Sequence, residues 1–322
     1  MQQKDSMTLE LVKKFEHINP ILTATTIDEN TAIFLSYNEE SMYYQLLLVS
    51  ESTYKIIPLD YKEKYYSLEN HPVLFSIDKH FGWIKNQNEL LLYSYENQAF
   101  ESIQIENSSI LPKRFNLTWR VPISDSSVLP VCFNGDGINH DTRYLAFLDL
   151  DIINKQAHWE SWTSLETAEF AYHQDNSYPP KIDTAMWKED GLYVFTSGGQ
   201  ITSVNKWGMD YYAFAKGNRN GAIEKILFDS GNLQAVNSKK QGVNGLFSNS
   251  KEYLLLTPIF KNDQWKGKQH ILNLESNEIS EIAFPRGFGK FPQIVQHFEN
   301  HFWVYLRDTK ELAICKLKKT AH

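Results

Sequence analysis

Cysteine is scarce in this chain: of 322 residues only Cys132 and Cys315 are cysteines, and each lies in a strand-like run. Two cysteines exclude a disulfide framework and cannot form a zinc site unaided, so we expect two buried, reduced thiols. Long apolar runs are also missing, because the longest, such as 46–49 and 254–256, have only the length of a strand. The N-terminal residues are polar and lead into no apolar signal segment, so we expect a cytoplasmic protein.

Helical periodicity is almost absent, whereas short apolar runs bounded by Asn, Asp, Gly, Ser and Pro recur along the chain. Aromatic residues make up 14% of the sequence, which favours β-structure. The net charge is −7, from 32 basic and 39 acidic residues. This acidic balance argues against nucleic acid as the main partner. The composition therefore predicts an all-β protein that binds neither nucleic acid nor a membrane.

A polar turn followed by an aromatic and aliphatic strand recurs six times. The centres of these strands, used here as markers, are Ile33, Trp83, Val131, Val194, Leu255 and Val304. Their spacings of 50, 48, 63, 61 and 49 residues fit a period of about 40–50 residues with insertions, which is typical of propeller blades with four strands each. Each marker strand is followed by a second apolar strand and then a more polar one, which we expect at the outer edge of the blade.

The sixth repeat lacks its outer strand, while a strand-like segment at 8–15 precedes the first repeat. Pairing this segment with the last blade would satisfy the hydrogen bonds of both edges. We therefore predict an all-β fold: one six-bladed β-propeller over residues 1–322, with its last blade closed by an N-terminal strand at 7–16. The predicted blades lie near 20–60, 72–105, 114–163, 181–228, 243–284 and 292–318. Two stacked β-sandwiches are the alternative.

The long loops of repeats three to five, which neighbouring blades would place on one face, form the predicted binding site. They contain exposed-looking aromatics (Tyr172, Tyr178, Trp207, Trp265), and Tyr and Trp are frequent anchors of protein interfaces. The other predicted binding residues are His140, Arg143, His173, Asp175, Lys206 and Asp263. The loop at 134–143 carries Asn134, Asp136 and Asp141 but lacks the further acidic ligands of a calcium loop, so we predict no metal.

The motifs of metalloproteases, phosphate loops and serine hydrolases are absent, and the 287–292 segment only begins like a dinucleotide fingerprint. We therefore predict no cofactor and a non-catalytic protein-binding propeller. One concrete form is an immunity-type inhibitor of a basic toxin enzyme, since an acidic binder attracts a basic partner. A scaffold within a larger assembly is a further hypothesis.

One stretch resembles sialidase-like propellers: Trp119-Arg120-Val121-Pro122, then the apolar strand 128–133 and the strand 144–151. The resemblance implies an Arg120 that binds a substrate carboxylate, as a guanidinium fork does on a planar anion. The alternative function is therefore a glycoside hydrolase or lyase acting on an anionic sugar. Its candidate catalytic residues would be Arg120, Asp136, Asp141, Glu166, Asp175 and Arg286.

Overall fold

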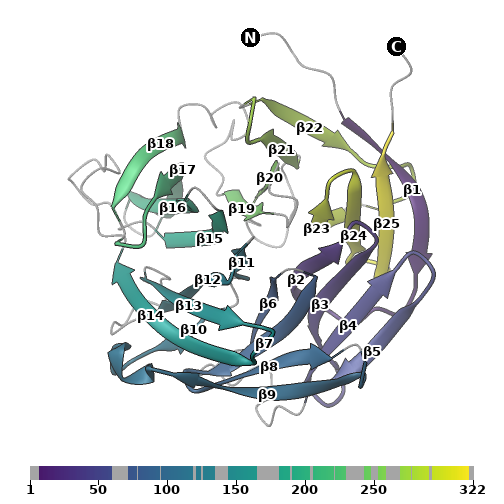
Figure 1. The fold of residues 1–322 in the computed structure, drawn as a ribbon. Helices are drawn as coiled ribbons and strands as arrows, with labels where there is room; N and C mark the ends of the chain where they lie inside the picture. Colours follow the sequence, from purple (N-terminus) through teal and green to yellow (C-terminus); the bar gives the residue numbers. More distant parts are fainter. Residues whose placement is uncertain are drawn as a thin grey trace. The chain divides into compact units, whose positions relative to one another are not determined.

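The computed structural model describes residues 7–59, 72–77, 79–94, 96–118, 121–124, 126–134, 144–164, 181–188, 191–203, 206–220, 222–229, 243–247, 253–258, 269–276, 278–289 and 292–318. These residues are almost entirely β-strands, with one short 3-10 helix at Ser108–Ile110 (Figure 1). By its internal contacts the chain divides into two compact units, 1–68 with 248–322 (unit 1) and 69–247 (unit 2). No helix among the described residues has the length and apolarity needed to cross a membrane.

Unit 1 contains two complete four-stranded antiparallel sheets, called blades here, of order β2-β3-β4-β5 and β23-β24-β25-β1, and the antiparallel strands β20-β21-β22. The strands are β1 (Met7–Phe15), β2 (Ile21–Asp28), β3 (Thr31–Tyr37), β4 (Tyr44–Ser50), β5 (Tyr54–Pro58), β20 (Tyr253–Pro258), β21 (His270–Asn273), β22 (Ile279–Ala283), β23 (Pro292–Phe298), β24 (His301–Leu306) and β25 (Glu311–Leu317).

Unit 2 contains the blades β6-β7-β8-β9, β10-β12-β13-β14 and β15-β16-β17-β18. Its strands are β6 (Val73–Ile77), β7 (His80–Asn86), β8 (Glu89–Ser94), β9 (Ala99–Glu106), β10 (Asn116–Leu117), β11 (Ile123–Ser124), β12 (Val128–Asn134), β13 (Tyr144–Asp151), β14 (Gln156–Ser164), β15 (Lys181–Lys188), β16 (Gly191–Ser203), β17 (Lys206–Gly217), β18 (Ile223–Asp229) and β19 (Val243–Phe247).

Consecutive four-stranded meanders are the architecture of a β-propeller, so the predicted fold class is confirmed. All six marker residues lie in strands, and in each complete blade the marker lies in the second strand. The blade count of six and the single-domain organisation with its blade boundaries remain predictions from the repeat spacing.

The burial pattern explains why inner and outer strands differ in sequence. The inner strand β3 is buried over five consecutive residues, so both of its faces are apolar. In the outer strand β9 buried Ile103 and Ile105 alternate with exposed polar residues, because one face meets solvent. Large aromatics fill the interior, and Trp83, Trp159 and Trp303 are fully buried.

The N-terminal strand closes the last blade, as predicted. β1 pairs antiparallel with β25, from Leu9 opposite Leu317 to Phe15 opposite Leu312, and its first residues pair in parallel with β22 (Figure 1). Leu9 and Phe15 are buried, whereas Leu11 and Val12 are 42% and 41% exposed. A β-bulge between Leu11 and Lys13 makes Val12 the extra residue and interrupts the alternation of the strand after Leu11.

Neighbouring blades are joined by buried polar side chains as well as by apolar packing. In unit 1, the fully buried Gln269 donates from Nε2 to the carbonyl of Pro292 and accepts from the amide of Ile294. In the same way Gln296 donates to the carbonyl of Ala24. These amides satisfy backbone groups that would otherwise be buried without a hydrogen-bond partner.

Candidate functional site

Most of the predicted site residues lie outside the described residues. These are Arg120, Asp136, His140, Asp141, Arg143, Glu166, Tyr172, His173, Asp175, Tyr178, Asp263 and Trp265. Arg286 is described and is exposed in the segment that follows β22. Lys206 and Trp207 begin strand β17. The assignment of these residues to a common site therefore remains a prediction.

Lys206 and Trp207 belong to the longest hairpin of the described chain, formed by β16 and β17. Near the blade, β16 pairs with β15 as far as Ser197, and β17 pairs with β18 from Ala213 onward. Beyond these positions the hairpin continues to the pair Ser203–Lys206. Among the described strands, residues 198–211 pair only with each other, so they form a two-stranded ribbon that extends past the rest of its blade; we call it the β16–β17 arm.

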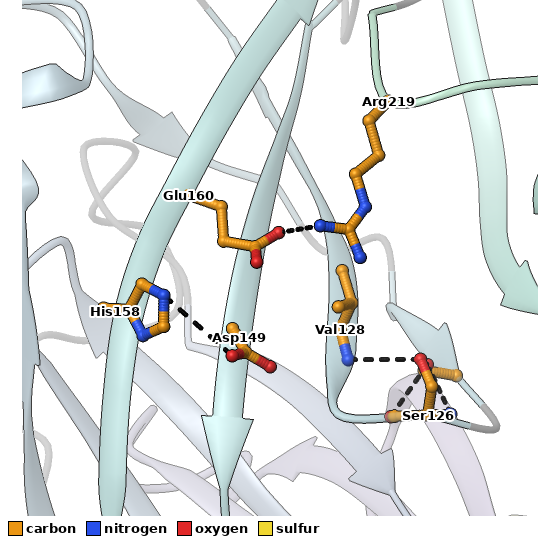
Figure 2. A network of polar contacts seen from close by, with 7 residues as sticks. Ser126, Val128, Asp149, His158, Glu160 and Arg219 are labelled. Carbon is orange, nitrogen blue, oxygen red and sulfur yellow. Dashed lines mark hydrogen bonds and ion pairs between the residues drawn. The ribbon is translucent and has the colours of Figure 1, made fainter.

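A cluster of polar side chains lies on the outer strands of the neighbouring blade. Asp149 in β13 and His158 in β14 are directly opposite each other, and Glu160 follows two residues after His158. One ligand-type atom from each of these three residues lies within 4.8 Å of the other two. Figure 2 shows His158 facing Asp149, and the carboxylate of Glu160 directed toward Arg219. We call these three residues the Asp149 cluster.

Arg219, in the turn between β17 and β18, joins the Asp149 cluster to the next blade. Its guanidinium donates to Glu160 Oε2 (Figure 2), and its Cζ lies 4.9 Å from the ring centroid of Trp187. Beside this pair, Thr163 Oγ1 donates to the carbonyl of Asn220 at 3.0 Å. Together these contacts connect the outer strand β14 with the β17–β18 turn.

None of Asp149, His158, Glu160 and Arg219 is among the site residues predicted from the sequence. His158 and Glu160 lie in a segment predicted as a polar outer strand, where polar side chains are ordinary. The signal that was available is the alternation of His158 and Glu160 on one strand, with Asp149 at the end of the preceding strand. Recognising the site also requires the register between the two strands, which the repeat spacing does not determine.

A second polar group lies in unit 1, around the buried His301. His301 Nε2 is 3.3 Å from Glu51 Oε1, which is also 2.8 Å from the Lys316 ammonium. Burial lowers the pKa of His301 below 6.5, and the nearby Lys316 charge lowers it further, while Glu51 opposes both. Lys316 in turn holds the pKa of Glu51 below its usual value. The group is a stabilising ion pair next to a histidine that burial keeps neutral.

Both cysteines are buried and free, as the sequence predicts. Burial raises the pKa of the Cys315 thiol to about 12, so this side chain stays protonated and unreactive at neutral pH.

No protein-family model matches the chain, and no curated protein matches its sequence. Among solved structures it is similar to YCF48 bound to D1 peptide, with 9% identity, 96% of each chain covered and a TM-score of 0.45. It is also similar to an oligogalacturonate lyase from Vibrio parahaemolyticus, with 9% identity, 98% and 99% covered, and a TM-score of 0.48. A third is the Cps50 (Swd1) β-propeller domain from Myceliophteria thermophila, with 10% identity, 96% and 100% covered, and a TM-score of 0.44. In sequence these proteins are remote, and the chain described here is an all-β protein with the β-propeller fold.

Proposed function

We propose that this protein is a non-catalytic binding propeller that docks another protein through its long loops and the β16–β17 arm. The observation that carries the proposal is the arm itself. A two-stranded ribbon is marginally stable alone, and its outer edges, which pair with no other described strand, present backbone donors and acceptors. A partner that packs on the ribbon or adds a strand to it would satisfy these groups, which is a recurrent mode of protein recognition.

The loop residues predicted from the sequence complete the proposed surface. Tyr172, Tyr178, Trp207 and Trp265 supply large aromatic side chains, which are common anchors of protein interfaces. His140, Arg143, His173, Asp175, Lys206 and Asp263 supply the polar contacts around them.

The charge of the chain favours a basic partner. With a net charge of −7 the protein attracts positively charged proteins and repels nucleic acid. Opposite charges accelerate association, which matters most for an inhibitor that must capture its target quickly. We therefore propose a cytoplasmic immunity-type inhibitor that neutralises a basic toxin enzyme.

The test compares the intact chain with a variant whose arm is removed. In that variant, residues 198–211 are replaced by Asn-Gly, a two-residue turn that suits a hairpin joining Ser197 to Tyr212. Both proteins are expressed in the native host and purified, and bound proteins are identified by mass spectrometry. Ile153→Ser is the matched control, because Ile153 is 92% exposed in a turn of unit 2 outside the proposed surface.

We expect one stoichiometric, basic protein to accompany the intact chain and the Ile153→Ser variant, and to be lost from the arm variant. The purified partner should then show an enzymatic activity that the intact chain inhibits at a 1:1 ratio. Retention of that partner by the arm variant, or co-purification of a small molecule with no protein, would contradict the proposal.

The alternative, an enzyme acting on an anionic sugar through Arg120 and Arg286, predicts turnover instead of inhibition. A panel of fluorogenic uronic and sialic acid glycosides separates the two functions. Hydrolysis that disappears with Arg120→Ala would replace our proposal, whereas a panel without turnover agrees with it.

A further inference from the structure

The Asp149 cluster combines one imidazole with two carboxylates, and the strand pairing explains why they converge. Asp149 and His158 are cross-strand partners in an antiparallel pair, so their side chains lie on the same face of the sheet. The separation between His158 Nε2 and Asp149 Oδ2 is 3.9 Å, which is too long for a hydrogen bond. The two groups therefore face each other without being directly bonded.

Glu160 lies at a β-bulge. Ser161 pairs with Phe147 and Trp159 pairs with Leu148, so Glu160 is the extra residue on the bulged strand β14. Bulges turn a side chain away from its regular position and are frequent beside functional sites. Glu160 is two residues from His158 and would lie on the same face of a regular strand, and at the bulge one of its carboxylate oxygens still lies within 4.8 Å of ligand-type atoms of His158 and Asp149.

The carboxylate of Asp149 shows that the cluster is incomplete. The side chain as a whole is 28% exposed, yet its Oδ1 atom is shielded from solvent and has no hydrogen-bond partner among the described residues. A buried carboxylate oxygen without a partner is costly, and native proteins satisfy such atoms with a donor, a water or an ion. This orphaned oxygen, within a group of ligand-type atoms, points to a bound cation.

We infer that Asp149, His158 and Glu160 form a binding site for a divalent transition metal of the zinc type. An imidazole nitrogen with two carboxylate oxygens suits Zn²⁺, whereas Mg²⁺ and Ca²⁺ prefer oxygen ligands alone. Three protein ligands leave at least one position for water. None of its residues belongs to the long loops or to the arm, and its existence does not depend on the proposed function.

Arg219 is compatible with a metal because it engages only one oxygen of Glu160. Its donor contact is to Oε2, which leaves Oε1 for the ion, and the Trp187 ring holds the guanidinium in place. Arg219 therefore shares Glu160 with the ion and competes with it for the charge of this carboxylate.

The test titrates the full-length protein, freed of metal with a chelator, with Zn²⁺ alone in an isothermal calorimeter. We expect one saturable site, with Mg²⁺ giving no comparable heat. His158→Gln and Asp149→Asn should each weaken Zn²⁺ binding by more than about tenfold, because each variant removes one of the three ligand groups. His80→Gln is the matched control, since His80 is also a partly exposed strand histidine of unit 2, and it should bind Zn²⁺ like the wild type.

Circular dichroism of each metal-free variant confirms that the fold is kept, and Arg219→Gln provides an independent check. Removing the competing guanidinium should leave Zn²⁺ affinity equal or increase it. The inference is wrong if the intact protein gives no saturable Zn²⁺ binding, or if His158→Gln and Asp149→Asn bind as tightly as His80→Gln. A loss in Arg219→Gln as large as that in His158→Gln would also overturn it, because the ion would then depend on the arginine contact.

Discussion

The closing strand β1 should contribute a large part of the stability of unit 1, and a matched pair of substitutions can show this. Leu9 is 2% exposed and Leu11 is 42% exposed, although both are leucines on the same strand two residues apart. Truncating a buried leucine to alanine typically costs about 2–5 kcal/mol, whereas a change at an exposed position stays within about 0.5 kcal/mol. We therefore expect Leu9→Ala to lower the free energy of unfolding by about 2–5 kcal/mol and Leu11→Ala to leave it nearly unchanged.

Removing the whole strand should have a larger effect. A chain that starts at Asn19 loses Leu9, Phe15 and Ile18, which are all buried, together with the β1–β25 ladder. At about 1.5–3 kcal/mol for each buried side chain, the apolar loss alone is roughly 5–9 kcal/mol. A typical domain is stable by only about 5–15 kcal/mol, so we expect the truncated protein to aggregate or to melt far below the intact one.

Urea unfolding followed by tryptophan fluorescence measures the two substitutions, and differential scanning fluorimetry measures the truncation. If Leu9→Ala and Leu11→Ala shift the urea midpoint equally, the register of β1 is wrong. If the truncated protein melts within a couple of degrees of the intact one, β1 is a loosely attached tail and does not close the blade.

Three further changes test other parts of the structure. Gly82→Ala should destabilise unit 2 by about 1–3 kcal/mol or more in urea unfolding, because a Cβ at Gly82 would meet the Leu91 carbonyl oxygen at 2.2 Å. The free energy of unfolding should fall as the pH drops below about 6.5, because burial lowers the pKa of His301 in the folded protein. On acidification this histidine is therefore protonated first in the unfolded chain, which stabilises the unfolded state. His301→Gln should flatten this part of the stability–pH curve. Arg219→Ala should lower the free energy of unfolding by at most about 1 kcal/mol in thermal or urea unfolding, because its ion pair with Glu160 is partly exposed, with the Arg219 side chain 41% accessible. A larger loss of stability would show that the contact between blades is cooperative.

The strands were predictable because each strand of the repeat has a characteristic local pattern of apolar and polar residues. Inner strands such as β3 are buried on both faces and read as continuous apolar runs, and polar turns separate them from outer strands of alternating pattern. The segment that completes the last blade could be predicted by counting strands, because the strand-like segment 8–15 had no partner and the last repeat was one strand short. Both deductions need only residue types and order along the chain.

Side-chain direction within an outer strand was less predictable. Simple alternation in β1 would give Leu9 and Leu11 the same environment, but Leu9 is buried and Leu11 is 42% exposed, and a bulge interrupts the alternation between Leu11 and Lys13. A bulge is set by how two strands fit together over their whole length, and nothing in the local sequence of β1 distinguishes Val12 as the extra residue. The same limit applies to β14, where the bulge falls on Glu160.

The Asp149 cluster is an example of a candidate site that could not be predicted from the sequence repeat. His158 and Glu160 lie two residues apart on a polar outer strand, a pattern that alternation assigns to an ordinary solvated face. Only the β13–β14 register sets Asp149 opposite His158, and a slip of one residue would move Asp149 to the other face. Arg219 comes from the next blade, 59 residues beyond Glu160, and reaches the cluster only because the two blades are neighbours. A sequence search for such sites in propellers should therefore align each pair of adjacent predicted strands in every possible register, allowing one bulge. The registers that place a histidine opposite an aspartate or glutamate are the candidates for a site.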